Sequence, residues 1–342
     1  MIDGINIEPV TAWLCEQVPD FKPPVRFELI AGGRSNLTFL CKDQRGRRVV
    51  LRRPPLGEVL QSAHDMGREH RIISALADST VPVPQTFGLA DAAVNGPVHE
   101  APFFVMDYVP GEVFHDSIGG RNAAAGDRHG IGMHVIGILA DLHVVDVDEV
   151  GLGELGRKEA YLERQLKRWT RQWDASKTET VPAMEESYRL LCKHMPQQVG
   201  AAIVHGDYRL GNMIVGDGRI QAILDWELCT LGDPLADLGY LLNNWVGPDE
   251  LAQSFPGDIS PTAVGGYPSR ETLCDVYAER TGRDLAHINY YRAFSHWRLA
   301  AIGQGVFKRY QSGAMGQNHG VDVDQKRDDV LQRAESALAL LS

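Results

Sequence analysis

The N-terminal third of the chain alternates between apolar and polar positions over short stretches bounded by Gly, Pro and Asp. This pattern is typical of β-strands. The expected strands cover residues 27–30, 37–41, 48–52, 86–90 and 103–106. Apolar residues recur at helical spacing over residues 7–18 and 63–76, so two helices are expected in the same part of the chain.

Beyond residue 111 the apolar positions follow mainly the period of α-helices. The expected helices cover residues 128–145, 157–173, 185–194, 270–280, 287–311 and 324–341. A short hairpin interrupts them, with strands at 213–215 and 220–224 joined by Asp217-Gly218, which is typical of a tight primed turn. We therefore expect an α+β fold with two lobes, an N-terminal antiparallel sheet with a helix and a mainly helical C-terminal lobe.

Length and composition narrow the class of protein. The 342 residues suffice for two lobes, and no apolar run approaches the ~20 residues of a membrane helix. The net charge of −11 argues against general nucleic-acid binding, which needs a basic face. The five cysteines are scattered without C-x-x-C pairing, and the N-terminus does not resemble a signal peptide. A cytoplasmic protein without a zinc site or disulfide framework is the simplest expectation.

Polar side chains gather at the mouth of the predicted hairpin. Residues 203–226 read IVHGDYRLGNMIVGDGRIQAILDW, so His205 and Asp207 follow one apolar run, Asn212 precedes the hairpin, and Asp225 ends it. Transfer of a γ-phosphoryl group needs a carboxylate that orients and deprotonates the acceptor hydroxyl, and oxygen ligands for Mg²⁺. The spacing H-x-D-x-x-x-x-N, followed one hairpin later by a metal-binding Asp, is that of kinase catalytic loops.

This H-G-D-x-x-x-x-N…D-W form, continued by LGDPLADLGYLL at residues 231–242, resembles the aminoglycoside phosphotransferase family. Members are small-molecule kinases with a protein-kinase-like fold, and the resemblance covers about residues 27–312. It implies ATP and Mg²⁺ as cofactors. It further implies that Asp207 is the catalytic base in a loop shared with Asn212, that Asn212 and Asp225 are Mg²⁺ ligands, and that Asp237 braces the loop.

The expected N-terminal lobe carries candidates for phosphate contacts. Ser35 and Asn36 lie in the glycine-bearing turn AGGRSN, where backbone N–H groups can approach phosphate oxygens, although an ordinary turn is the alternative. Kinases carry a phosphate-binding Lys on the third strand, but this chain has Arg52 with Arg53 beside it. A guanidinium can grip phosphate bidentately, so either arginine is a candidate, and a charged strand edge is the alternative.

Two further features complete the expected nucleotide site. Glu69, in the helix over 63–76, is the candidate partner of the strand cation, with a solvent-facing glutamate as the alternative. Residues 103–111 (FFVMDYVPG) match the family's hinge, where backbone groups of Asp107 and Val109 would bind adenine. The resemblance thus implies a nucleotide-binding lobe over residues 1–106 and a catalytic and acceptor-binding lobe over residues 107–342.

The sequence after Asp225 favours a small acceptor. Only eleven residues separate Asp225 from Asp237, and the A-P-E segment that protein kinases use to seat a peptide is missing. A Pro- and Gly-rich stretch over 248–269 is a plausible mobile loop over the acceptor pocket. Neighbouring helices are basic, and Arg164, Arg168 and Arg298 are candidates for binding an anionic acceptor, with a solvated helix surface as the alternative.

Two segments resemble one branch of the family, the phosphotransferase domain fused to acyl-CoA dehydrogenases: VLRRPP at residues 50–55 and YLERQLKRW at 161–169. Members of that branch are implicated in phosphorylating hydroxylated fatty acyl groups, although this chain has no room for a flavin dehydrogenase domain. We expect an ATP-dependent kinase for a hydroxy acid or hydroxyacyl-CoA, functionally linked to acyl-CoA dehydrogenase. An aminoglycoside or choline-type O-phosphotransferase, and a catalytically silent ATP-binding regulatory module, are the alternatives.

Overall fold

The computed structural model describes residues 3–31, 36–56, 65–91, 98–253, 260–313 and 321–342. By internal packing, one unit comprises Met1–Gly111 and Gln221–Leu228, and the other comprises Glu112–Ile220 and Cys229–Ser342. The short segment Gln221–Leu228 thus packs with the N-terminal part of the chain. The domain division expected at residue 106 stays a prediction, and in this assignment the hairpin residues 221–228 belong with the first unit.

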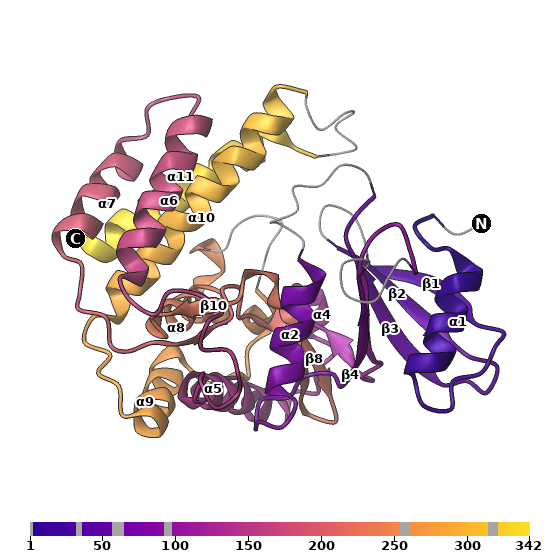
Figure 1. Ribbon diagram of the computed structural model, residues 1–342. Coiled ribbons are helices and arrows are strands. Elements are labelled where there is room, and N and C mark those ends of the chain that lie inside the picture. Colours follow the sequence, from indigo (N-terminus) through magenta and orange to yellow (C-terminus); the bar gives the residue numbers. More distant parts are fainter. Residues whose placement is uncertain (1–2, 32–35, 57–64, 92–97, 254–259, 314–320) are drawn as a thin grey trace. The chain divides into compact units, whose positions relative to one another are not determined.

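An antiparallel sheet of five strands forms the N-terminal unit, with the strands in the order β1-β2-β3-β5-β4 (Figure 1). The strands are β1 (Arg26–Ala31), β2 (Leu37–Lys42), β3 (Arg48–Arg53), β4 (Thr86–Ala90) and β5 (Phe103–Asp107). All five lie where the apolar alternation predicted them. The expected α+β class with an N-terminal antiparallel sheet is therefore confirmed.

The two faces of this sheet are covered by different helices. Val49 and Leu51 of β3 pack in a core with α1 (Ile7–Gln17), whereas Arg52 points to α2 (Met66–Leu76) on the opposite face (Figure 1). Successive side chains of a strand point to opposite faces. The alternation along β3 therefore separates the two neighbouring arginines at its end.

Helix α2 begins later than residue 63. Its first residue is Met66, and the side chain of Asp65 caps it by accepting a hydrogen bond from the amide of Arg68 at 2.9 Å. A capping carboxylate of this kind favours a helix start at the following residue. Residues 63 and 64 of the predicted helix lie outside the described residues.

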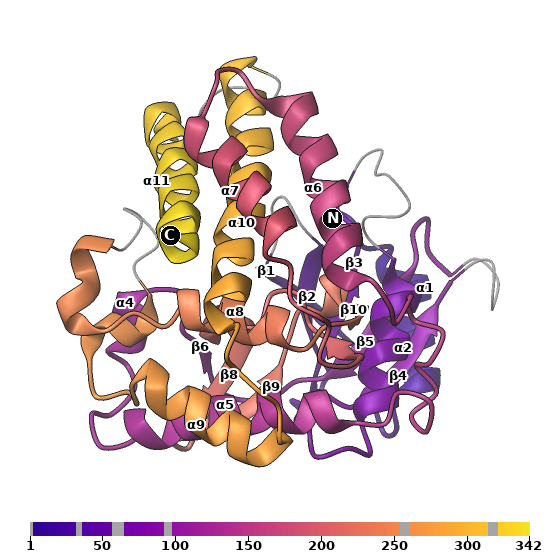
Figure 2. The ribbon, with the colours of Figure 1, turned by 90° about the vertical axis from the view of Figure 1, so that its left-hand side faces the viewer.

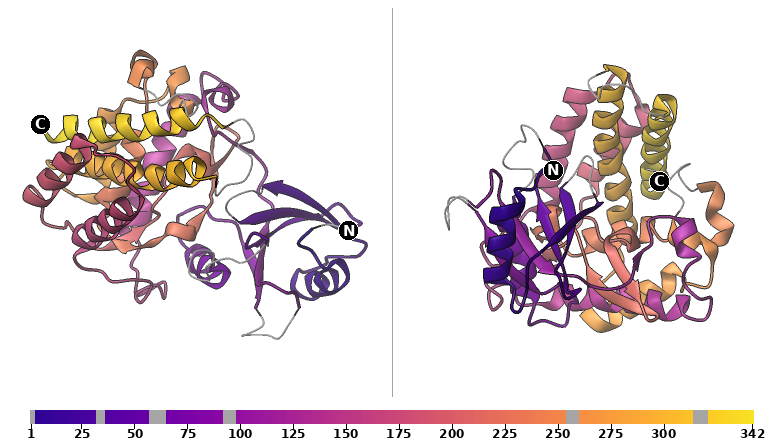
Figure 3. Two further views of the ribbon diagram at one scale, coloured as in Figure 1. Left: turned by 90° about the horizontal axis from the view of Figure 1, so that it is seen from above. Right: turned by 90° about the vertical axis from the view of Figure 1, so that its right-hand side faces the viewer.

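Helices make up much of the second unit. They are α4 (Ser117–Gly120), α5 (Arg128–Val144), α6 (Tyr161–Ser176), α7 (Pro182–Lys193), α8 (Leu235–Asn243), α9 (Arg270–Thr281), α10 (Ile288–Gln311) and α11 (Val323–Leu341). Helix α10 packs against α6, α7, α8 and α11 (Figures 2 and 3). Because neighbours surround it, α10 buries side chains along most of its length.

Helix α6 begins four residues after the predicted start at residue 157. Ala160 has a left-handed backbone (φ +50°), and the amide of Tyr161 donates to the side chain of Gln198 at 3.2 Å. Residues 157–160 therefore form a turn instead of the predicted first helical turn, and a hydrogen bond to the distant Gln198 stabilises it. Gln198 is distant in sequence, so the local pattern of residues around Tyr161 could not predict this hydrogen bond.

Short strands position the polar residues of the second unit. The strands are β6 (Glu112–Val113), β7 (Ala202–Val204), β8 (Met213–Gly216), β9 (Arg219–Ile223) and β10 (Thr230–Gly232). Strand β7 pairs with β10, and β6, β8 and β9 form a second small sheet. Asp217 (φ +50°) and Gly218 (φ +68°) join β8 to β9 with two positive φ angles. This confirms the primed turn, which needs φ above zero at both central residues.

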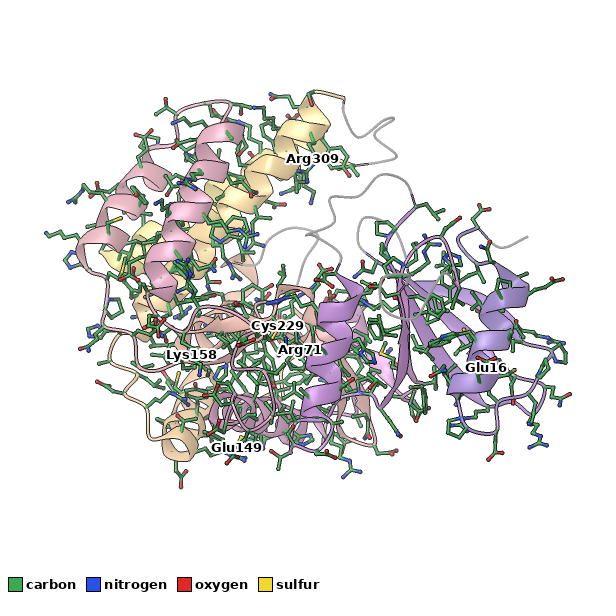
Figure 4. All side chains as sticks on the ribbon, viewed as in Figure 1. Glu16, Arg71, Glu149, Lys158, Cys229 and Arg309 are labelled. Carbon is green, nitrogen blue, oxygen red and sulfur yellow. The ribbon has the colours of Figure 1, made fainter. Side chains whose placement is uncertain are left out.

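The expected loop over 248–269 contains two 3₁₀ turns, Pro248–Gln253 and Pro261–Val264, and its residues 254–259 lie outside the described part. The five cysteines are all unpaired, and Cys229 (labelled in Figure 4) is buried in the second unit. Among the described residues, no helix has the length and apolar character that crossing a membrane requires.

Candidate active site

The loop after β7 is held from behind by Asp237 of α8. The carboxylate of Asp237 accepts hydrogen bonds from the backbone N–H groups of both His205, at 2.6 Å, and Gly206, at 2.9 Å. Gly206 has φ +87°, a left-handed conformation that glycine adopts without strain. This contact is the brace that the sequence implied, and it fixes the backbone directly before Asp207.

Asp237 is fully buried beside the buried ring of His143. Burial opposes ionisation of Asp237, but the His143 ring and the Gly206 amide favour the carboxylate and hold its pKa below the ordinary value. Burial lowers the pKa of His143, whose Nε2 lies 3.5 Å from Asp237 and whose Nδ1 lies 2.7 Å from the hydroxyl of Tyr277. His143 therefore packs against the buried carboxylate that holds the loop.

Asp207 is held by an amide and a hydroxyl and also faces a guanidinium. We call Asp207, Asn212 and Tyr240 the loop cluster. The amide of Asn212 donates to Oδ2 of Asp207 at 2.7 Å and to its carbonyl oxygen at 2.9 Å. The hydroxyl of Tyr240 donates to Oδ1 in a short hydrogen bond. Arg209 Nε lies 3.4 Å from the same Oδ1, and the Asp207 side chain is 24% exposed. The carboxylate is thus fixed in orientation yet accessible.

Arg52, Glu69 and Asp225 form a second group, which we call the ionic cluster. Nε of Arg52 lies 3.0 Å from Glu69 Oε2, and Nη2 lies 2.5 Å from Asp225 Oδ1. Glu69 is almost completely buried, and that burial raises the pKa of Glu69 while the charge of Arg52 opposes the rise. All three residues belong to the first unit.

The structure distinguishes the two arginines of β3. Arg53 points to the face of α1, where its guanidinium donates to the carbonyl oxygens of Gly4 and Pro54 and lies 3.5 Å from Glu100. Only Arg52 contacts the helix glutamate, because period-two alternation places it on the face of α2. Arg52 is therefore the arginine of β3 that pairs with the helix glutamate.

The donor atoms of Asn212 and Asp225 suit Mg²⁺, which prefers oxygen ligands. Both hydrogens of the Asn212 amide point toward Asp207, so its oxygen is the atom that can ligate a cation. Asp225 has a left-handed backbone (φ +65°) and a side chain that is 29% exposed. Such a conformation is rare for a residue other than glycine and is often found at functional positions.

The remaining nucleotide-site candidates lie in the first unit. Asn36 is buried, and its amide donates to Glu227 at 3.4 Å, whereas Ser35 lies outside the described residues. The backbone N–H of Asp107 already donates to the carbonyl oxygen of Gln85 at 2.7 Å. Asp107 would thus have to offer its carbonyl oxygen to a nucleotide.

Comparison with known proteins decides the family. Residues 26–267 match the family model APH, the phosphotransferase enzyme family. The chain belongs to this phosphotransferase family. A crystal structure from Ralstonia eutropha, named for the aminoglycoside phosphotransferases, is 31% identical with a TM-score of 0.80, over 98% of this chain and 97% of that one. The expected enzyme class is therefore confirmed.

Curated relatives carry a different name. Mouse acyl-CoA dehydrogenase family member 11 is 35% identical over 98% of this chain, but the match covers 43% of that protein. Mouse family member 10 is 38% identical over 82% of this chain and 26% of its own length. The chain spans less than half the length of these relatives. Their names agree with the branch that the sequence indicated.

More distant structures share the fold of this phosphotransferase. A thermostable mutant of aminoglycoside phosphotransferase APH(4)-Ia, in a ternary complex with AMP-PNP and hygromycin B, is 15% identical with a TM-score of 0.60 and covers 98% of both chains. At this identity the similarity establishes the kinase-like fold alone.

The three arginines predicted to bind the acceptor differ in burial and in their contacts. Arg164 donates to the carbonyl oxygen of Arg157 at 2.8 Å, and Arg168 lies exposed with its guanidinium 4.8 Å from the ring of Trp169. Arg298 of α10 is instead buried and donates to the carbonyl oxygen of Gly206 at 3.0 Å. Its described contacts are thus with the Gly206 carbonyl and the ring of Tyr240, and an acceptor-binding role for the three arginines stays a prediction.

Sequence reasoning missed Tyr240. The signal was present, because Tyr240 follows Asp237 by three residues on α8 and residues at that spacing share a helix face. Once Asp237 was expected to face the loop, Tyr240 could have been expected to face it too. The contact of Arg298 with the loop had no comparable local signal.

Proposed function

We propose that this phosphotransferase transfers the γ-phosphoryl group of ATP to a hydroxyl of an anionic small molecule, a hydroxy acid or a hydroxyacyl-CoA. The loop cluster is the observation that carries the proposal. A partly exposed carboxylate, fixed by an amide and a hydroxyl, is suited to accept a proton from an alcohol. The braced backbone before Asp207 supports the same role.

In the proposed reaction Asp207 accepts the proton of the acceptor hydroxyl as its oxygen attacks the γ-phosphorus. The bond between that phosphorus and the β,γ-bridging oxygen breaks, ADP leaves, and the phosphate ester remains. Little covalent chemistry is asked of the protein, so orientation and charge supply most of the acceleration. Asn212 and Tyr240 keep the carboxylate oriented for this transfer.

The proposed nucleotide contacts follow from the first unit and from family membership. Arg52 steadies the phosphates, and Glu69 holds its guanidinium. Asn212 and Asp225 are the proposed ligands of Mg²⁺, which when bound neutralises phosphate charge. Backbone groups of Asp107 and Val109 would take the adenine. On this proposal residues 1–106 are the nucleotide-binding lobe and residues 107–342 the catalytic and acceptor-binding lobe.

Ser35 and Asn36 are proposed to contact phosphate oxygens, on the sequence resemblance alone. The use of ATP is supported by the AMP-PNP complex of the fold neighbour APH(4)-Ia. A cytoplasmic setting is proposed from the five unpaired cysteines.

The choice of an anionic acceptor rests on relatives and on charge. The curated relatives are named for acyl-CoA dehydrogenases and extend well beyond this chain, which supports a functional link to acyl-group metabolism. Arg164 and Arg168 give α6 a basic surface, which suits a carboxylate or CoA thioester better than a polycationic aminoglycoside. An aminoglycoside or choline-type acceptor remains the second candidate because of the structural neighbours.

The test is ADP release by the purified protein with Mg²⁺ and ATP against a panel of acceptors. The panel holds 3- and 4-hydroxy acids, their CoA esters, kanamycin and choline, with Asp207→Asn as the blank. Turnover confined to hydroxyacyl compounds supports the proposal in full. Turnover on kanamycin would retain the kinase chemistry and overturn the anionic acceptor. ATP binding without turnover, equal in both proteins, would favour the silent regulatory module.

A further inference from the structure

Tyr240 is buried directly behind the carboxylate of Asp207. Its side chain is 7% exposed, and its hydroxyl donates to Oδ1 of Asp207. Burial and the charge of Asp207 raise the pKa of Tyr240 well above its ordinary value. The raised pKa favours the protonated hydroxyl, so Tyr240 is the donor in this hydrogen bond.

Tyr240 and Asn212 each donate a hydrogen bond to a different carboxylate oxygen of Asp207. Tyr240 occupies Oδ1 and Asn212 occupies Oδ2. A carboxylate with one donor on each oxygen cannot rotate about its last bond without breaking a hydrogen bond. Oδ1 also faces Arg209 Nε at 3.4 Å, whereas Oδ2 can still accept a second donor such as an acceptor hydroxyl.

Arg298 of α10 contacts both the ring of Tyr240 and the loop before Asp207. Its guanidinium lies 5.5 Å from the centre of the Tyr240 ring and donates to the carbonyl oxygen of Gly206 at 3.0 Å. One buried cation thus contacts both the loop backbone and the aromatic ring behind the loop carboxylate. The charged groups that face Tyr240 are Asp207, Arg209 and Arg298.

We propose that Tyr240 is a positioning residue, which holds the Asp207 carboxylate in the orientation for proton transfer and is itself held by Arg298. This inference rests on the proposed function, because it assigns Tyr240 a role that acts through Asp207. It predicts that loss of the hydroxyl slows turnover without weakening nucleotide binding, and that the loss has no effect once Asp207 is neutralised.

The second unit offers a matched control. The hydroxyl of Tyr291 donates to Oδ2 of Asp233 at 2.7 Å, and both residues are fully buried. This pair has the same chemistry as Tyr240 and Asp207 but lies among α10 and the start of α8. Tyr291→Phe therefore removes an equivalent hydrogen bond without touching the loop cluster.

The experiment compares steady-state ADP release with Mg²⁺ and ATP for the wild type, Tyr240→Phe, Tyr291→Phe, Asp207→Asn and the double variant Tyr240→Phe/Asp207→Asn. The acceptor is the panel compound with the fastest turnover. We expect Tyr240→Phe to lower kcat roughly 10- to 100-fold, with the KM for ATP unchanged and a melting temperature close to that of Tyr291→Phe. Tyr291→Phe should retain the wild-type kcat.

The double variant decides whether Tyr240 acts through Asp207. Residual activity equal to that of Asp207→Asn alone supports the inference. A wild-type kcat in Tyr240→Phe, or the same fold loss in both backgrounds, overturns it while leaving the proposed function intact. An active Asp207→Asn enzyme overturns the proposed base itself, and with it this inference, as does a wild type that turns over no panel compound.

Arg298→Lys gives a second route if Tyr240→Phe is too unstable to assay. Lysine keeps the charge but loses the planar guanidinium that reaches both the ring and the Gly206 carbonyl. A lower kcat at unchanged KM for ATP supports the inference. An unchanged kcat in a folded Arg298→Lys protein would overturn the part assigned to Arg298.

Discussion

The ionic cluster and the loop cluster each hold a carboxylate to which we assign a part in the reaction, but they do so by different means. In the ionic cluster, the guanidinium of Arg52 is balanced by the carboxylates of Glu69 and Asp225. In the loop cluster, the hydrogen-bond donors to Asp207 are an uncharged amide and an uncharged hydroxyl, and the charged Arg209 lies farther away, with its Nε 3.4 Å from Oδ1. Opposite charges cancel, whereas neutral donors orient a carboxylate and leave its charge in place.

This difference suits the two proposed tasks. A group that grips phosphate must be held in place and stay charged, and an acidic partner provides both. A general base must be oriented but must remain able to take a proton, which a strong ion pair would oppose. The comparison therefore predicts that substitutions in the loop cluster change the rate of transfer, whereas substitutions in the ionic cluster change the binding of nucleotide.

Asp207→Asn should have the largest effect on the rate. The amide keeps the size of the side chain but cannot accept the acceptor's proton, so we expect kcat to fall by roughly 10²- to 10⁴-fold. Nucleotide affinity, measured by calorimetry, should stay close to that of the wild type. Wild-type kcat in this variant would remove Asp207 from the chemistry.

Asp225→Ala should weaken the binding of Mg²⁺ and ATP rather than the transfer step. The change removes an oxygen ligand and one partner of Arg52, so we expect the KM for ATP to rise at least roughly tenfold. A titration of activity against Mg²⁺ measures the effect. Asp217→Asn, an exposed carboxylate in the same hairpin, is the control. An unchanged Mg²⁺ requirement in Asp225→Ala would separate this residue from the metal.

Asp237→Asn should cost both stability and rate. The asparagine amide would face one of the two backbone N–H groups that Asp237 accepts, leaving a buried donor unpaired. We expect the free energy of unfolding to fall by about 1–3 kcal/mol. Denaturant unfolding measures the loss, and Asp141→Asn, which breaks a partly exposed pair with Arg280, should cost less than about 1 kcal/mol. Equal losses in the two variants would contradict the proposed brace.

The smallest expected effect is a pH dependence of stability at His143. Because burial lowers the pKa of His143, the folded protein keeps the ring neutral while the unfolded chain protonates it as the pH falls below about 6.5. The contribution of His143 to stability is thus present above that pH and is lost as the pH falls toward the lowered pKa. The difference in melting temperature between the wild type and His143→Phe should shrink from pH 7.5 to 5.5. A constant difference would show that the pKa of His143 is the same in the folded and unfolded states.

Local patterns predicted what depends on neighbours in sequence. The strands, the primed turn at Asp217-Gly218 and the order of Asp207, Asn212 and Asp237 were all legible from spacing. Strand alternation could also have separated Arg52 from Arg53, because only one of them shares a face with Val50. Each of these features depends on residues close together in sequence, for which the backbone geometry of a strand, turn or helix gives the relative positions.

Contacts between distant elements could not be predicted in the same way. Arg298 reaches Gly206 across 92 positions of sequence, and its place depends on how α10 packs in the second unit. The start of α6 depends on Gln198, which lies 37 positions away from Tyr161. Nothing in the local pattern distinguishes such residues from ordinary surface arginines or glutamines, so their roles emerge only from the fold.

The arginine at the end of β3 has a practical consequence for chemical profiling. Nucleotide reagents that acylate a lysine beside the phosphates depend on an amine that can lose its proton and attack. Arg52 presents a guanidinium, which stays protonated and is a poor nucleophile. At this position an amine-directed label has no atom to modify. With Arg52 beside the phosphates, as proposed, a survey of ATP-binding proteins that labels only this lysine would not detect the chain.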